Sequence, residues 1–261
     1  MDIKKALRTL QVEFPFLLEW KFQTMRRLRS ALNLPFERDF AAIPLLSPPP
    51  DALFLDVGAN RGQSTDAILM MVPGARVQLF EPNHQLFVRL QGIFASLPHV
   101  VQHNFGLGDE KTEAVLHVPF YKQWMFDGLA SFDEHEARDW LDGRMYFFKS
   151  SHVRVEKSIC RVQRLDDMAL RPFFVKIDVQ GFELNVLKGG RQTLIEHKPV
   201  LLIEAPSPAI IEFLAALGYE PYAFDAGRFH RGRRGRLNTF FLTPDKAAAI
   251  AASARPAVAA G

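Results

Sequence analysis

The feature that most constrains this chain is the stretch FLDVGANRG, residues 54–62, where an apolar run meets two glycines and then a helical pattern. The apolar run predicts a buried strand, and the two glycines around an asparagine predict a tight turn into a helix. Backbone amide groups at such a helix start can bind a ligand. The pattern is also that of an ordinary glycine-rich connection, so both interpretations stay open at this point.

The loop carries a carboxylate where a dinucleotide-binding loop has its first glycine. Asp56 takes that place in the spacing D-x-G-x-N-x-G, and we expect Gly58 and Gly62 to let a ligand lie against the backbone on either side of Asn60. A carboxylate repels a pyrophosphate and attracts a cation. The loop therefore favours S-adenosylmethionine, with its sulfonium and amino group, over a nicotinamide dinucleotide.

Strand and helix patterns alternate beyond this loop, which predicts an α/β fold with a mostly parallel sheet covered by helices on both faces. Expected strands cover residues 53–57, 76–80, 100–102, 173–177, 200–203, 219–224 and 238–242. We divide the chain into an N-terminal helical extension with a proline-rich linker, one α/β domain and an alanine-rich tail that is disordered or loosely helical. These parts are residues 1–50, 51–243 and 244–261.

A long segment, about residues 113–170, interrupts the alternation and predicts an insertion. Residues 114–118 and 159–162 are expected strands that flank an aromatic and acidic stretch. Long insertions in compact domains are often lids over a site, although a satellite hydrophobic cluster explains the aromatic residues equally well. If the insertion is a lid, the candidates for contact with a second substrate are Trp124, Asp127, Ser131 and Trp140.

Four expected strands end in an acid, namely Asp56, Glu81, Asp178 and Glu204. Ligands of open α/β sheets bind at the carboxyl ends of strands, so these acids should face a common cleft. Glu81 follows the second strand, where an acid can accept hydrogen bonds from both hydroxyls of a ribose. Asn104 follows the third strand and is either a hydrogen-bonding partner for adenine or part of a simple turn.

Several motifs together resemble the FkbM-type S-adenosylmethionine-dependent methyltransferases. They are DVGANRG at 56–62, FEP at 80–82, KIDVQGFE at 176–183 with LKG at 187–189, and the run 199–204. The resemblance covers about residues 51–243. It implies a seven-stranded class I methyltransferase sheet with an antiparallel final strand, and O-methylation of a hydroxyl on a sugar, glycan or polyketide-like natural product. Many members have Glu where this chain has Gln180, which bears on proton handling or metal binding.

The strand order implied by the resemblance divides the four acids by function. Asp56 and Glu81 would hold the cofactor, while Asp178, and Glu204 beside it, would lie near the methyl group and the acceptor. Asp178 is the preferred base or acceptor-orienting residue, with capping of the following helix as the alternative. Glu183 and Glu204 could join Asp178 around a divalent cation, but no metal is predicted.

A lysine in the fourth strand raises a separate question. Lys176 should share a sheet face with Asp178, and a lysine in a buried strand needs a partner, so we expect a structural ion pair there.

Composition sets the remaining expectations. The surplus of 32 basic over 29 acidic residues does not indicate nucleic acid, and we expect none as a partner. The single cysteine, Cys160, and the lack of a membrane-length apolar run favour the cytoplasm. The oligomeric state and the acceptor cannot be inferred from the sequence.

Two basic segments allow alternative functions. The pattern over residues 1–40, with Leu18, Phe22, Met25, Leu28 and Leu32 at helical spacing, predicts a basic amphipathic helix that covers the core or contacts a membrane surface or partner. A non-catalytic scaffold is therefore an alternative function. The arginine-rich stretch Arg228–Arg236 is either a solvated loop or a contact for an anionic substrate, as in a nucleic-acid methyltransferase.

Overall fold

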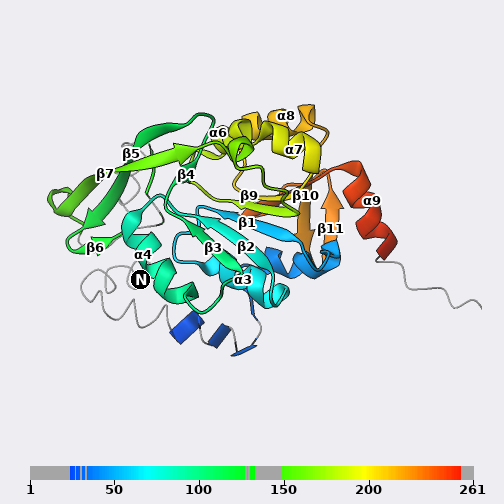
Figure 1. Cartoon of the computed structure of the whole chain (residues 1–261), viewed down its shortest axis with the longest axis horizontal. Coiled ribbons are helices and arrows are strands. Elements are labelled where there is room, and N and C mark those ends of the chain that lie inside the picture. The colour runs from blue at the N-terminus through cyan, green and yellow to red at the C-terminus, as the bar shows by residue number, and fades with distance from the viewer. Residues whose placement is uncertain are drawn as a thin grey trace, which may run out of the picture.

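The computed structural model describes residues 24–126 except 27, 30 and 33, then residues 128, 130–132 and 148–253. The main sheet, at the centre of Figure 1, has eight strands in the order β11-β10-β12-β9-β8-β1-β2-β3. Their bounds are β1 Leu53–Val57, β2 Arg76–Phe80, β3 Val100–His103, β8 Phe174–Ile177, β9 Val200–Glu204, β10 Glu220–Asp225, β11 Arg228–Arg231 and β12 Asn238–Leu242.

Strands β9, β8, β1, β2 and β3 pair in parallel, and β12 pairs antiparallel with both β9 and β10. The expected order of neighbouring strands, second-first-fourth-fifth, is confirmed as β2-β1-β8-β9. The final strand, β12, is antiparallel as expected. The expected number of strands is wrong by one. Arg228–Arg231, expected to be part of a loop, forms the edge strand β11 because the turn at Ala226 and Gly227, both with positive φ, folds it back onto β10.

Helices cover both faces of the main sheet (Figure 1). On one face lie α3 (Gln63–Met71) and α4 (His84–Phe94), and on the other lie α6 (Glu183–Gly189), α7 (Arg191–His197) and α8 (Pro208–Ala216). Each face has its own cluster of buried apolar side chains. Strand β1 is buried along its whole length, as the nearly continuous apolar run predicts for a central parallel strand.

The core begins earlier in the chain than the expected boundary at Asp51. The 3-10 helix η1 (Arg38–Leu46) lies on the α3 side, and its Phe40, Ala42 and Ile43 are fully buried. Pro44 lies inside this helix rather than in an exposed linker. The prolines favoured the interpretation of this stretch as a linker, although it also carries buried apolar residues. The expected proline-rich linker therefore includes part of the core.

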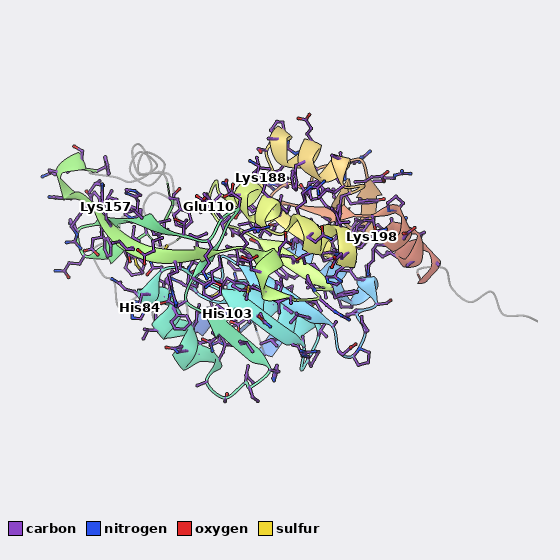
Figure 2. All side chains as sticks on the ribbon, turned by 45° about the horizontal axis from the view of Figure 1, so that its top comes forward. His84, His103, Glu110, Lys157, Lys188 and Lys198 are labelled. Atoms are coloured by element: carbon purple, nitrogen blue, oxygen red, sulfur yellow. The ribbon has the colours of Figure 1, made fainter. Side chains whose placement is uncertain are left out.

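The insertion forms a second sheet with the order β4-β7-β5-β6. Its strands are β4 Gly106–Leu107, β5 Thr112–Tyr121, β6 Trp124–Met125 and β7 Val153–Gln163, with the short 3-10 helices η3 (Ser150–His152) and η4 (Leu165–Met168) flanking β7. Strands β5 and β7 pair antiparallel over ten residue positions. In Figure 2, Lys157 on β7 and Lys198 after α7 lie toward opposite sides of the molecule.

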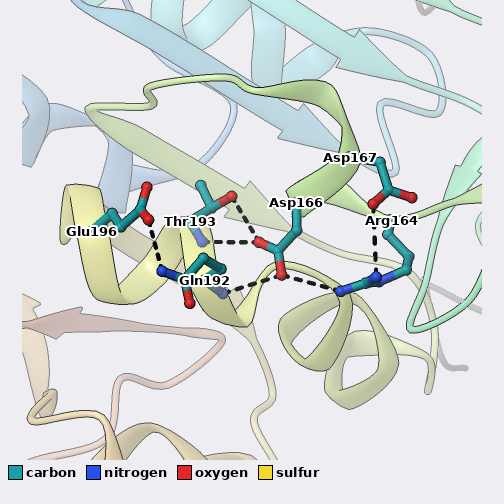
Figure 3. Close-up of polar contacts among 6 residues, drawn as sticks. All are labelled: Arg164, Asp166, Asp167, Gln192, Thr193 and Glu196. Carbon is teal, nitrogen blue, oxygen red and sulfur yellow. Dashed lines mark hydrogen bonds and ion pairs between the residues drawn. The ribbon is translucent and has the colours of Figure 1, made fainter.

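The junction between η4 and α7 shows how the insertion returns to the main sheet (Figure 3). The carboxylate of Asp166 accepts hydrogen bonds from the backbone amides of Gln192 (3.1 Å) and Thr193 (2.8 Å) and from the Thr193 hydroxyl (2.8 Å). Gly190 precedes α7 and has no side chain to cap it, so Asp166 caps this helix from η4. The contact attaches the end of the insertion to the helical layer.

Beyond the main sheet, Pro244–Ser253 forms the helix α9, and its Ala247 and Ile250 pack against the core. Of the two alternatives for the tail, this described part is helical; residues 254–261 lie outside the described residues. Most of the expected N-terminal helix also lies outside them. Among the residues that the structure describes, no helix is both long enough and apolar enough to span a bilayer.

Candidate active site

The glycine loop after β1 forms the expected turn. Its glycines are needed because other parts of the protein lie where their side chains would be. Gly58 and Gly62 have φ values of 84° and 83°. A Cβ on Gly58 would lie 1.9 Å from the backbone oxygen of Asp178, and one on Gly62 would lie 2.9 Å from the Phe94 ring. The protein itself therefore fills the space that we expected these glycines to leave for a ligand.

Asn60 and Glu81 connect the glycine loop to the end of β2. Asn60 has a left-handed backbone (φ 49°), which asparagine tolerates better than most residues, and its amide donates a 2.7 Å hydrogen bond to Glu81 Oε2. The amide of Asn83 donates to Oε1 of the same carboxylate at 2.8 Å. Two backbone amides thus orient the Glu81 carboxylate at the end of β2.

Asn104 contacts the loop after β2 and is not among the residues that line the pocket described below. Its Nδ2 donates to the backbone oxygen of Glu81 at 3.0 Å, and its Oδ1 lies 2.9 Å from Nδ1 of His84. His84 on α4 and His103 on β3 are labelled in Figure 2. The side chain of Asn104 is thus engaged by the protein at both ends, which matches the simple-turn alternative.

Asp56 lies beneath the loop in the core. Its side chain is fully buried; Oδ2 accepts a 2.6 Å hydrogen bond from the Thr65 hydroxyl, and Oδ1 has no hydrogen-bond partner among the described residues. Burial raises the pKa of Asp56 to about 6, opposed by the Thr65 hydrogen bond and the charge of Lys176. An unpaired buried carboxylate oxygen is costly, so a bound cationic group or its water would stabilise this arrangement.

A pocket beside the glycine loop is lined by residues of both sheets and of the loops next to them. From the main sheet and its loops come Val57, Gly58, Asn60, Phe80, Glu81, Pro82, Asp178, Val179 and Gln180, and from the segment that contains the second sheet come Gly106, Leu107, Leu116, Gly128, Ala130 and Phe132. Of the four strand-end acids, Glu81 and Asp178 line this pocket, whereas Asp56 and Glu204 do not. Asp56 is fully buried, and Glu204 neighbours the pocket-lining Asp178.

Asp178 and Glu204 form a carboxyl pair at the ends of β8 and β9. Burial first, and then the neighbouring Asp178, raise the pKa of Glu204 to about 8. Gln180 Nε2 donates a 2.8 Å hydrogen bond to Asp178 Oδ1. The alternative role for Asp178, capping of the next helix, is not seen: α6 has no side-chain cap, and Glu183 Oε1 accepts from the amides of Val179 and Gly181 in the turn before it.

A buried polar network lies behind this pair. Lys176 is fully buried, and its Nζ donates to Asn238 Oδ1 at 2.8 Å, so its direct partner is an amide rather than the expected acid. Asn238 Nδ2 in turn donates to Glu37 at 2.7 Å and to Asp39 at 3.0 Å. Burial raises the pKa of both carboxyls.

Sequence reasoning missed Asn238, Glu37 and Asp39, because nothing in their local sequence indicates that they meet Lys176. The sequence indicated only that a buried lysine needs a partner, and this did not identify which residue the partner is.

The candidates for acceptor contact are only partly described. Ser131 Oγ donates to the backbone oxygen of Gln180 at 3.2 Å, and Trp124 stacks with the Arg61 guanidinium 5.5 Å from its ring centre. Asp127 and Trp140 lie outside the described residues. Over the described ranges, no group of three or more His, Cys, Asp or Glu side chains is arranged to hold a metal ion.

The arginine-rich stretch begins in β11 and ends beside β9. Arg231 pairs with Glu220 through two hydrogen bonds of 2.6 Å, and Arg234 donates to the backbone oxygen of Pro206. A Cβ on Gly235 would lie 1.7 Å from the backbone oxygen of Asn238, so this turn packs tightly against the start of β12. Two of the five arginines thus have contacts within the protein.

The fold and site define an α/β protein whose pocket lies at the carboxyl ends of parallel strands, lined by an acid after β2 and an acid after β8. The profile of the methyltransferase FkbM domain family matches residues 56–221, and the chain belongs to this family. The family implies S-adenosylmethionine as the cofactor, and the residue types here are compatible with it. The Glu81 carboxylate and the apolar Phe80 and Leu107 line the pocket, and Asp56 Oδ1, which has no hydrogen-bond partner among the described residues, is buried in β1.

Two named relatives are similar to this chain over part of its length. The chain is 34% identical over 169 residues to the AMB antimetabolite synthetase AmbE of Pseudomonas aeruginosa, covering 54% of this chain and 8% of that protein. It is 25% identical over 161 residues to the 2-O-methyltransferase NoeI of Sinorhizobium fredii, covering 57% of this chain and 61% of that protein. The chain thus spans less than two thirds of either relative.

Among solved structures, the methyltransferase FkbM of Methylobacillus flagellatus is similar with a TM-score of 0.46 and 19% identity, over 85% of this chain and 60% of that one.

Proposed function

We propose that this chain transfers a methyl group from S-adenosylmethionine to a hydroxyl of a sugar, glycan or polyketide-like natural product. The observation that carries the proposal is a pocket lined by both Glu81 and Asp178. Glu204 neighbours Asp178. The name of the 2-O-methyltransferase relative is consistent with an oxygen acceptor.

Each group has a separate task in the proposed reaction. The cofactor, when bound, supplies a methyl group on a sulfonium. Glu81, together with the backbone around Gly58 and Asn60, holds the ribose, and Asp56 favours the positive charge of the amino acid end. Asp178 orients the acceptor hydroxyl and accepts its proton, while Phe80, Leu107 and Phe132 exclude water from the pocket.

Thermal unfolding with added ligands tests the cofactor. We expect S-adenosylmethionine and its demethylated product to raise the Tm and NAD to leave it unchanged, because a ligand that binds only the folded state stabilises it. Asp56→Ala should abolish the shift. Glu81→Gln should weaken binding roughly 10-fold to 100-fold, since hydrogen bonds to a charged group contribute about 1.5–3 kcal/mol. Glu212→Gln, on the exposed face of α8, is the matched control. An equal shift with NAD would contradict the proposal.

The acceptor is found by comparing extracts of cells with and without the gene by mass spectrometry. Compounds that are lighter by one methyl group in the absence of the protein are the candidates. Their hydroxyl should be methylated by the purified full chain, and Asp178→Asn should reduce that rate by about 100-fold or more, in the range of lost general-base catalysis.

We also propose that the N-terminal segment contacts a membrane surface or partner. Met25, Leu28 and Leu32 are 37%, 50% and 57% exposed, whereas Arg26 donates two hydrogen bonds to Asp66 on α3, the longer being 2.7 Å. The described apolar positions thus face outward while an arginine attaches the segment to the core. Co-sedimentation of the full chain with anionic vesicles, and its loss in Leu28→Glu with Leu32→Glu, tests this contact. Binding that persists in this variant would contradict it.

A further inference from the structure

Arg26 attaches the N-terminal segment to the two helices that hold the glycine loop. Its guanidinium donates hydrogen bonds to both carboxylate oxygens of Asp66 on α3, the longer being 2.7 Å. The same guanidinium lies 5.4 Å from the ring centre of Phe94 on α4. The Asp66 side chain is only 14% exposed, so this bidentate ion pair is better shielded from water than an ordinary surface pair. One side chain of the N-terminal segment therefore contacts both helices.

The two contacts of Arg26 lead directly to Gly62, the glycine that ends the loop. A Cβ on Gly62 would lie 2.9 Å from the Phe94 ring and 3.0 Å from Leu90 Cδ2, so α4 packs against this residue. Gly62 is also the N-cap of α3, and its backbone oxygen accepts a 2.9 Å hydrogen bond from the Asp66 amide. Of the two residues that Arg26 contacts, one is thus hydrogen-bonded to Gly62 and the other is packed on it.

The first turn of α3 is held by side chains from two directions. Gly62 offers no side chain to cap this helix. Beneath the loop, the Thr65 hydroxyl donates a 2.6 Å hydrogen bond to Asp56 Oδ2, while the next residue, Asp66, pairs with Arg26. The other oxygen of Asp56 has no hydrogen-bond partner among the described residues. The position of α3, and with it the Thr65 contact that orients Asp56, therefore depends on Arg26.

We propose that Arg26 is a positioning residue for the cofactor site, and that it makes the affinity for S-adenosylmethionine depend on the N-terminal segment. The inference rests on the proposed function, in which the glycine loop and Asp56 hold this cofactor. Arg26, Asp66 and Phe94 are not among the residues that line the pocket, so Arg26 acts through the loop. A loop that is already ordered loses less conformational entropy when a ligand binds, so the attached segment strengthens binding.

A second arginine of the same segment provides the comparison. The guanidinium of Arg29 lies 5.1 Å from the ring centre of Phe36, which belongs to the N-terminal segment itself. This contact stabilises the segment internally, whereas the contacts of Arg26 connect the segment to α3 and α4. Arg29→Gln is therefore the matched control for Arg26→Gln.

Isothermal titration calorimetry of the full chain with S-adenosylhomocysteine measures the affinity without turnover. We expect Arg26→Gln to raise the Kd about 10-fold, because both hydrogen bonds to Asp66 are lost. Arg26→Lys should raise it less, since lysine keeps the charge but not the bidentate geometry. Asp66→Asn should weaken binding as much as Arg26→Gln does. The double variant should be no weaker than either single one, because each change removes the same contact.

Two controls separate positioning from a general loss of stability. Arg29→Gln should leave the Kd unchanged. Leu214→Ala, which removes a fully buried side chain on α8, should lower the free energy of unfolding and also leave the Kd unchanged. An unchanged Kd in Arg26→Gln would overturn the proposal, as would an equal rise of the Kd in Leu214→Ala.

Hydrogen exchange of the ligand-free chain measures the loop itself. Residues 58–66 should exchange faster in Arg26→Gln than in the wild type, and at the wild-type rate in Arg29→Gln. Wild-type exchange of these residues in Arg26→Gln would also overturn the proposal. Failure of the proposed function would show separately, as the absence of S-adenosylhomocysteine binding by the wild type, and the exchange rates would then decide the positioning of the loop by themselves.

Discussion

At the scale of single residues, the site depends on backbone atoms as much as on side chains. Gly58 lies against the backbone oxygen of Asp178, and the Asp178 amide donates a 3.0 Å hydrogen bond to the Val57 carbonyl. The cofactor loop and the proposed base are therefore in direct backbone contact. In the proposed mechanism, a change at either residue would displace the other and would thereby couple cofactor binding to catalysis.

Gly58→Ala should be far more costly than a similar change at another glycine with positive φ. Its Cβ would meet a backbone oxygen at 1.9 Å, so we expect a loss of at least about 3 kcal/mol in the free energy of unfolding. Gly74→Ala is the matched control, because Gly74 has φ 79° and no atom within 4 Å of the added Cβ. It should cost about 1–2 kcal/mol, the strain of a left-handed residue. Urea unfolding measures both, and equal losses would refute the contact.

The buried carboxyl of Asp56 should make stability depend on pH. Its pKa is raised from 3.8 to about 6, so the folded state binds the proton more tightly than the unfolded chain does. Its contribution to stability is therefore greatest at low pH and falls as the pH rises through this window. Relative to Asp56→Asn, the wild type should lose about 2 kcal/mol of unfolding free energy between about pH 4.5 and about pH 7.

Asp51→Asn, at an exposed position before β1, is the surface control measured over the same range of pH. A pH-independent difference between Asp56→Asn and the wild type would show that the Asp56 carboxyl is not perturbed by folding.

At the scale of elements, η1 connects the N-terminal part of the chain to both the core and the site. Its apolar residues pack under the main sheet, while Asp39 at its start and Glu37 just before it accept hydrogen bonds from Asn238. The family profile matches residues 56–221, so η1 and β12 lie outside the matched residues yet hold the network around Lys176. A domain truncated at residue 51 would lose both contributions.

Phe40→Ala tests this role for η1. Removal of a fully buried phenylalanine should cost about 3–5 kcal/mol, through lost transfer free energy and the cavity that remains. Leu45→Ala in the same helix, at a position that is 42% exposed, should cost less than about 1 kcal/mol. Chemical unfolding of both variants gives the comparison. A small effect for Phe40→Ala would mean that η1 is dispensable to the core.

At the scale of the whole molecule, the pocket lies where the main sheet meets the inserted sheet. Leu116 on β5 and Phe132 after β6 line it together with residues of β1, of β2 and of the turn that follows β8. Phe132 also contacts Phe182, with ring centres 4.7 Å apart, so the insertion packs on the segment that follows β8. The lid and satellite-cluster alternatives thus describe the same segment: it has its own small core and also closes one side of the pocket.

Cofactor binding should therefore protect both sheets. We expect S-adenosylhomocysteine to slow amide hydrogen exchange in residues 54–62 and also in β5, because its binding disfavours local opening on both sides of the pocket. Helix α8, remote from the pocket lining, is the internal control and should exchange at an unchanged rate. Hydrogen exchange with mass spectrometry resolves the three regions. Protection confined to residues 54–62 would show that the insertion is not part of the cofactor site.

The sequence by itself determined the features that local patterns encode. The apolar runs identified the parallel strands, the glycines identified the turn after β1, and the acids after β2 and β8 identified two residues of the pocket lining. The proline-rich stretch was wrongly expected to be only a linker, and the arginine-rich stretch was wrongly expected to be only a loop, because their composition is typical of exposed chain. The elements that they form, η1 and β11, depend on contacts with other segments of the chain.

Only the tertiary structure decided how the carboxyls divide between core, pocket and network. Asp56 and Glu81 both follow apolar strand residues, yet one is buried against Thr65 and the other lines the pocket. The partner of Lys176 is 62 residues away, and Asn238 reaches Glu37 across 201 residues. Such contacts depend on which strands become neighbours, and no local pattern records that. The glycine loop was therefore predictable as a turn, whereas its role in holding Asp178 was not.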